Sequence, residues 1–194
     1  MSKPARDDDD DTTVPPEDEA GLFLFYLERQ RATFAWKTGG LDATALRATL
    51  APSAMTLGGM LKHLARFEDD MTHEWLLGQG QRAPWHAIDW ATDGAWDWRT
   101  AADDAPATLY AGWHDAVERS RTIIGDAITA GGLDERARGA ATEQGPMTLR
   151  NILLNMIEEY ARHNGHADLI RESIDGLVGQ DPPEDTARQE HDHA

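Results

Sequence analysis

Four long segments in which apolar residues recur every three or four positions constrain this chain more than any other feature. They cover residues 18–37, 57–77, 106–130 and 149–175. This spacing places the apolar side chains of each segment on one face of a helix. No alternating polar and apolar pattern, typical of a strand, competes with it. The pattern therefore predicts an all-α fold, and four helices of ~20–27 residues, each ~30–40 Å long, suit a four-helix bundle.

Residues that favour helix ends support these boundaries. Thr56 and Thr148 are suited to cap the second and fourth helices, and Pro106 falls in the first turn of the third. Glycine follows the predicted end of each helix. The Gly58-Gly59 pair lies inside the start of the second helix, where it predicts close packing against a neighbour.

One connection is unusually long and rich in tryptophan. Residues 79–105 join the second and third helices and contain Trp85, Trp90, Trp96 and Trp98. A connection of this length is usually functional or disordered, and so many aromatic side chains argue against disorder. We expect either a lid that packs over one end of the bundle or a wall of a ligand pocket.

Both ends of the chain are acidic and contain proline. Residues 1–19 hold eight acids and two bases, and residues 181–194 hold five acids and one base. Such segments bury too little apolar surface to fold, so we expect two flexible tails around one domain at residues 20–180. The acidic excess gives the whole chain a formal charge of −17. A binder of nucleic acid or of anionic membranes needs a basic face, so both classes are disfavoured.

Targeting signals and cysteine chemistry are missing from the sequence. No apolar run approaches 18 residues, and the N-terminus lacks the apolar core of a signal peptide. A cytoplasmic location is therefore the default expectation. The chain contains no Cys, which excludes a disulfide framework, a cysteine zinc site and a protein thiol nucleophile. Protease, phosphate-loop and hydrolase-elbow motifs are also missing.

Polar residues interrupt the apolar faces of the second and fourth helices. His163 falls inside the apolar stripe of its helix, Glu159 lies at the edge four residues earlier, and His63 borders the stripe of the second helix. Residues four apart project from one helix face at ~6 Å, a workable span for two ligands of one metal. Buried imidazole and carboxylate groups need partners, and one divalent cation serves both. The sequence thus predicts a metal site of His63, Glu159 and His163.

The pattern leaves the metal and the neighbouring roles open. Two His and one Glu with free positions fit catalytic zinc, and nickel or iron would accept the same ligands. A Glu–His pair four residues apart also forms a hydrogen bond without any metal. His166 either faces the same cavity or points to solvent. Glu68 either supports a ligand through a hydrogen bond or reaches solvent from the helix end.

Three stretches resemble one known family. The last-helix stretch Met156-Ile-Glu-Glu-Tyr-Ala-Arg-His-Asn-Gly-His-Ala-Asp-Leu-Ile-Arg-Glu-Ser-Ile-Asp-Gly176 resembles the signature of the DinB-like superfamily, in its actinobacterial mycothiol-transferase branch. The stretches Leu57–Glu68, with its single His, and Phe25–Phe34 are also similar to that branch. The resemblance extends over roughly residues 20–178.

The resemblance implies a fold, a site and an activity. It implies a four-helix bundle with a divalent metal, often zinc or nickel, held by one His of the second helix and two residues four apart on the last. In this chain those positions are His63, Glu159 and His163. Related proteins include mycothiol and bacillithiol S-transferases and a mycothiol-dependent maleylpyruvate isomerase. They often pair, so a homodimer is a further expectation, through a face that the sequence does not identify.

Three functions follow as hypotheses. In the first, the metal activates the thiol of a small cofactor such as mycothiol for attack on a small electrophile. In the second, the same site activates water, as in a metal hydrolase or isomerase. In the third, the bundle is a non-catalytic metal-binding module whose acidic tails recruit a basic partner.

Overall fold

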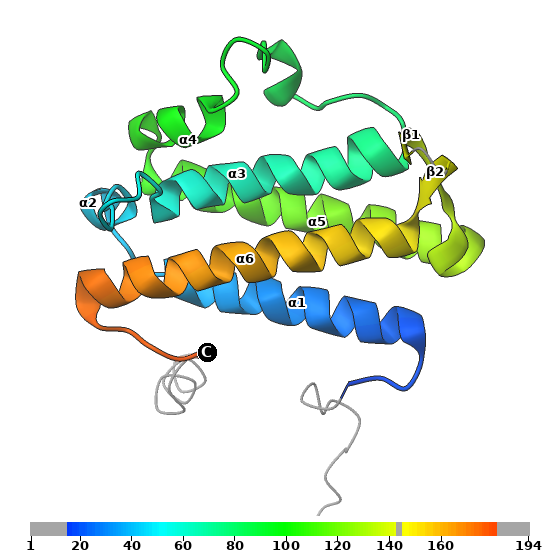
Figure 1. Cartoon of the computed structure of the whole chain (residues 1–194), viewed down its shortest axis with the longest axis horizontal. Helices are drawn as coiled ribbons and strands as arrows, with labels where there is room; N and C mark the ends of the chain where they lie inside the picture. The colour runs from blue at the N-terminus through cyan, green and yellow to red at the C-terminus, as the bar shows by residue number, and fades with distance from the viewer. Residues whose placement is uncertain (1–14, 143–144, 182–194) are drawn as a thin grey trace, which may run out of the picture.

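Four long helices dominate the structure, a computed structural model that describes residues 15–142 and 145–181. These helices are α1 (Glu19–Thr38), α3 (Leu57–Asp69), α5 (Pro106–Gly131) and α6 (Leu149–Asp175), and they lie side by side (Figure 1). The chain is mostly helical, as expected, and also contains one small sheet. The predicted tails lie largely outside the described residues. Within the described ranges, no helix is both long and apolar enough to cross a membrane.

The predicted helix ends are confirmed where side chains cap them. The Thr56 hydroxyl accepts a hydrogen bond from the Gly59 N–H at 2.9 Å at the start of α3. At the start of α6, the Asn151 side chain accepts from the Thr148 N–H at 3.1 Å. Gly176 ends α6 with a φ of 78°, a left-handed conformation that glycine adopts without steric cost.

The second predicted helix changes its character halfway. The α-helical part ends at Asp69, and residues Asp70–Leu76 continue as a π-helix, η1. A π-helical turn holds an additional residue for each hydrogen bond, so it alters which side chains face the core. The expectation of one regular helix over residues 57–77 was therefore wrong in its second half.

The structure contains a β-hairpin where the sequence showed no strand pattern. Strands β1 (Arg136–Thr142) and β2 (Gly145–Thr148) pair antiparallel; they follow α5 and precede α6 in the chain and lie at one end of the long helices (Figure 1). The first strand reads Arg-Ala-Arg-Gly-Ala-Ala-Thr and has almost none of the β-branched or aromatic residues that mark strands. The hairpin packs on η1, and at Gly139 a Cβ would lie 2.0 Å from the Glu74 carbonyl oxygen. Only glycine permits this approach.

The tryptophan-rich connection is partly helical and packs against α3. It contains the short helices η2 (Trp85–Ala87), α4 (Trp96–Thr100) and η3 (Ala101–Asp103). Trp85 is buried, and the other three tryptophans of the connection pack against the core from its edge. Gly59 makes room for this segment, because a Cβ there would lie 2.7 Å from the Trp98 ring. The close packing predicted for the glycine pair is thus confirmed. The other long connection contains helix α2 (Ala43–Leu46).

A buried polar cluster joins the four long helices. Glu68 of α3 is fully buried and accepts two hydrogen bonds from Arg31 of α1, at 2.8 and 2.6 Å. The Tyr160 hydroxyl of α6 donates to Glu68 at 2.7 Å, and Arg31 also donates to Ser120 of α5 at 3.1 Å. We call Arg31, Glu68, Ser120 and Tyr160 the core polar cluster. Apolar side chains from all four helices form the rest of the core.

Candidate metal centre

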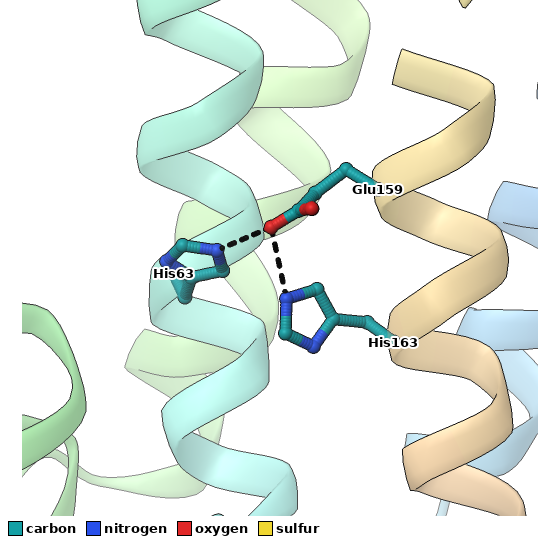
Figure 2. A group of neighbouring side chains, drawn as sticks. All are labelled: His63, Glu159 and His163. Carbon is teal, nitrogen blue, oxygen red and sulfur yellow. Dashed lines mark hydrogen bonds and ion pairs between the residues drawn. The ribbon is translucent and has the colours of Figure 1, made fainter. Parts of the chain in front are cut away.

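The structure brings the three predicted ligands together between two helices. His63 projects from α3, and Glu159 and His163 project from α6 toward it (Figure 2). The Nε2 atoms of His63 and His163 each lie 3.1 Å from the same oxygen, Oε1 of Glu159. One ligand atom from each of the three residues lies within 4.8 Å of the others. The four-residue spacing on α6 places Glu159 and His163 on one face, as the sequence predicted.

The cluster is largely shielded from water. His163 is buried, the His63 side chain is 12% exposed and the Glu159 side chain is 22% exposed. The Trp98 ring stacks on His63 with centroids 4.8 Å apart and lies 5.6 Å from the His163 ring. Glu159 therefore provides the most exposed side of the cluster, while Trp98 covers the imidazoles.

A carboxylate behind His63 determines which nitrogen of that ring carries a proton. Oδ2 of Asp97, which is completely buried, lies 3.1 Å from His63 Nδ1. An ionised carboxylate only accepts, so Nδ1 donates its proton to Asp97. In the neutral ring, the Nε2 lone pair then points at a Glu159 oxygen that is itself rich in lone pairs. This contact needs a positive charge between the two atoms, either a proton or a metal ion.

In this cluster, burial and the hydrogen bonds between the residues shift the pKa values in opposite directions. Burial lowers the pKa of His63, but hydrogen bonds to Asp97 and Glu159 outweigh burial and raise it above its ordinary value. Hydrogen bonds from His163 and His63 hold the pKa of Glu159 well below its usual range. Burial alone would raise the pKa of Asp97. The hydrogen bond to His63 and the charge of Arg66 outweigh burial, and together they lower the pKa of Asp97. Without a metal, the raised pKa of His63 favours a proton on this ring, and the lowered pKa values of Glu159 and Asp97 favour their ionised forms.

The donor set suits a divalent transition metal. Two imidazole nitrogens and one carboxylate oxygen are ligands that zinc, nickel and iron accept. Tetrahedral ligands at about 2.1 Å from zinc lie about 3.4 Å from one another, close to the observed 3.1 Å contacts. Three protein ligands leave positions for a further molecule. The residues present therefore fit a metal centre of the catalytic type.

Two neighbours discussed from the sequence lie outside the cluster. Glu68 belongs to the core polar cluster and hydrogen-bonds none of the three residues, so neither of its expected roles is confirmed. The His166 ring is partly buried and its centroid lies 5.5 Å from that of His163. Burial lowers the pKa of His166, and so do the charges of His163 and Arg162.

Sequence reasoning missed the groups that hold His63 in place. Arg66 Nε donates to Asp97 Oδ2 at 3.0 Å, so the carboxylate is bound from two sides. Asp97 lies 34 residues from His63, in a segment without helical periodicity, so no spacing rule connects the two. Its position between Trp96 and Trp98 was the available signal, because an acid flanked by packed aromatic residues needs a buried partner.

The helical core and this cluster define a helical protein with a candidate metal centre of two His and one Glu. Comparison with known families gives the family directly. Residues 22–176 match the family model described as Mycothiol-S-transferase, so the chain belongs to the mycothiol S-transferase family. No curated protein matches the chain significantly.

Proposed function

We propose that this chain is a divalent-metal-dependent thiol S-transferase that uses mycothiol, or a similar small thiol, against a small electrophile. The four long helices would then form the DinB-like four-helix bundle, with the metal bound by His63, Glu159 and His163. One observation carries the proposal: two imidazole nitrogens from different helices lie 3.1 Å from a single carboxylate oxygen. Membership of the mycothiol S-transferase family supports the thiol as cosubstrate.

In this proposal some residues bind the metal ion, and others orient the ligands or exclude water. A bound divalent cation would supply a positive charge that favours the thiolate form of a coordinated thiol. Asp97 keeps the proton of His63 on Nδ1, so that Nε2 offers its lone pair to the site. Trp98 covers the imidazoles and limits the access of water. Glu159 would add a negative charge to the ligand set, because a carboxylate coordinates a metal in its ionised form.

The nucleophile comes from the cosubstrate in this scheme. The chain has no Cys, so it supplies no thiol of its own. The thiolate would attack an epoxide, an activated halide or an unsaturated carbonyl, forming a carbon–sulfur bond. With halides, the electron pair of the broken bond leaves with the halide. With epoxides it goes to the ring oxygen, and the thiol proton is returned to that oxygen. With unsaturated carbonyls, the π electron pair of the carbon–carbon double bond moves toward the carbonyl group, and the thiol proton is returned to the α-carbon.

Metal analysis combined with one substitution tests the proposal. Purified, untagged protein is expected to contain about one zinc, nickel or iron ion per chain, and chelation should lower the melting temperature because a ligand of the native state stabilises it. In His163→Ala, bound metal and thiol transfer should be lost together. His86→Ala is the matched control, since His86 is exposed and lies in the short helix η2.

Other outcomes would select another function. Thiol transfer by metal-free His163→Ala protein would reject the scheme. Turnover without added thiol would favour a metal hydrolase or isomerase at the same site. A protein with no bound metal, and with a melting temperature that chelation leaves unchanged, would favour a non-catalytic module.

A further inference from the structure

A cavity lies beside the three candidate metal ligands and is separate from them. An open cavity of about 480 Å³ is bordered by α3, α5 and the connection between them. From α3 it is lined by Lys62, Ala65 and Asp69, which share one helix face, whereas His63 is rotated by about 100° from Lys62. Volumes of this order hold small organic ligands.

Helix α4 is the wall between the cavity and the metal site. Its Trp96 and Thr100 line the cavity. Its Asp97 and Trp98 contact His63 on the other side. In Figure 1, α4 lies over α3, in line with this placement. The cavity therefore has its own walls and is a site distinct from the three metal ligands.

The walls of the cavity combine indole rings with negative charge. Trp85 and Trp96 form part of its apolar lining. Four carboxylates and two cations also line it: Asp69, Asp103, Asp104, Asp115, Lys62 and Arg119. A third cation, Arg82, does not line the cavity but lies 3.8 Å from Asp69, so the local excess is one negative charge. An anionic ligand would meet this excess of carboxylates, while a cationic ligand would compensate it.

The two lining cations are already paired, and two carboxylates are not. Lys62 Nζ lies 2.6 Å from Asp104, and Arg119 lies 3.0 Å from Asp69. Asp103 and Asp115 are exposed, and their side chains have no hydrogen bond or ion pair within residues 15–142 and 145–181. These two acids are therefore free to receive a cation that the chain does not itself provide.

Lys62 demonstrates that this wall accommodates an ammonium group. Its Nζ lies 4.4 Å from the centroid of the Trp96 ring and 2.8 Å from the Thr100 hydroxyl, in addition to its contact with Asp104. Indole faces attract cations through the ring quadrupole, most strongly where water is excluded. Lys62 itself occupies this Trp96 face and Asp104, so an incoming amine would have to use the other lining carboxylates, Asp103 and Asp115.

We propose that the cavity binds a small organic cation, an amine or quaternary ammonium with an apolar body. The apolar body would lie against Trp85 and Trp96, and the charged group would face Asp103 and Asp115. This inference does not depend on the transferase proposal, because the cavity shares no lining residue with the metal ligands.

Three probes with one phenylpropyl body test the charge preference. Calorimetric titration of the full chain, with chelator present, would compare 3-phenylpropylammonium, neutral 3-phenylpropanol and anionic 3-phenylpropanoate. We expect saturable binding of the ammonium, roughly tenfold weaker binding of the alcohol, and no measurable binding of the carboxylate. Equal affinity for the ammonium and the alcohol, or a preference for the carboxylate, would overturn the proposal.

One glycine allows the cavity to be filled without disturbing the fold. Gly112 lines the cavity, and a Cβ there would meet no atom within 4 Å. Gly112→Leu should therefore keep the protein folded and abolish ammonium binding. Gly125→Leu is the matched control, since Gly125 lies on the same helix α5, also faces open space and does not line the cavity. Binding that survives in Gly112→Leu would place the ammonium elsewhere and contradict the proposal.

Charge removal provides the second line of evidence. The double variant Asp103→Asn/Asp115→Asn should weaken ammonium binding about tenfold and leave binding of the alcohol unchanged. Glu172→Gln removes an exposed acid of α6 that does not line the cavity, and it should bind the ammonium like the unmodified chain. An unchanged affinity in the double variant would show that the carboxylates do not recognise the cation.

Discussion

At the scale of single residues, Asp97 orients His63, one of the three candidate metal ligands, from the side of the ring that faces away from the other two. It contacts neither Glu159 nor His163, yet it fixes the proton of His63 on the nitrogen that faces away from them. Arg66 binds the same carboxylate oxygen from the other side, and the hydrogen bond from His63 together with the charge of Arg66 lowers the pKa of Asp97. The orientation of one ligand thus depends on a residue that the ligand spacing does not include.

Asp97→Asn is expected to weaken metal binding about 10–100-fold, because carboxamides orient a ligating imidazole less firmly than carboxylates. Competition with a chromophoric chelator measures the affinity. Asp93→Asn, which alters a partly exposed acid in the same connection, should leave it unchanged. Equal metal affinities for the two variants would mean that Asp97 has no positioning role.

At the scale of the elements, the π-helix η1 begins with a carboxylate in an unfavourable place. The Asp70 side chain is 12% exposed and lies near Asp69 and Glu74. Arg66 and Gln81 donate hydrogen bonds to it, each at 3.1 Å. Burial nevertheless raises its pKa from 3.8 to about 6. The folded chain therefore binds a proton at Asp70 more readily than the unfolded chain does.

This shift gives the stability of the protein a pH dependence of known sign. Since the pKa of Asp70 is higher in the folded state, its charged form costs stability above pH 6, and the cost disappears as the pH falls below about 4. Asp70→Asn should therefore be more stable than the unmodified chain by about 1–3 kcal/mol at pH 7.5, and equally stable near pH 4. Urea unfolding at both pH values measures the difference.

The control for this prediction is Asp126→Asn, an exposed acid on α5. It should change the free energy of unfolding little at either pH. If Asp70→Asn gives no gain at pH 7.5, the Arg66 and Gln81 contacts offset the burial of the carboxylate completely.

The same elements show what the sequence could and could not predict. Helical periodicity and the caps at Thr56 and Thr148 located the four long helices within about one residue at most ends, because these signals are local. The strand Arg136–Thr142 was missed because it has almost none of the residues that favour strands, and its packing through Gly139 against Glu74 joins segments distant in the sequence. Asp97 was missed because its contact with His63 also joins distant segments. The candidate ligands were found because the four-residue spacing of Glu159 and His163 and the place of His63 beside an apolar stripe are each visible within a single helix.

At the scale of the whole molecule, the core polar cluster connects one residue from each long helix. Arg31, Glu68, Ser120 and Tyr160 all lie where apolar side chains would otherwise meet. A buried ion pair contributes little net stability compared with apolar residues of similar volume, but removing one partner strands the other charge. Rotation of any one helix would break hydrogen bonds of this cluster and leave buried charged groups without partners, so alternative packings of the four helices are higher in free energy.

Glu68→Gln should destabilise the chain by about 2–4 kcal/mol, because it removes the buried counter-ion of Arg31 and leaves only the partly exposed Glu28, 2.6 Å away, to balance that charge. The double variant Arg31→Met/Glu68→Leu should lose less than the sum of the two single changes, since neither charge remains. Chemical unfolding in the presence of a chelator measures all variants with the metal excluded. Additive losses would show that the two side chains are not coupled.

Helix α4 has only five residues, yet it contributes side chains both to the surroundings of His63 and to the neighbouring cavity. Its Asp97 and Trp98 set the position of an imidazole, while its Trp96 and Thr100 shape the neighbouring hollow. A ligand that tilts helix α4 when it binds in the cavity therefore also changes the orientation of the His63 ring. If such a ligand changes the affinity of His63, Glu159 and His163 for a metal ion by some factor, thermodynamic linkage requires that a bound metal change the affinity for the ligand by the same factor.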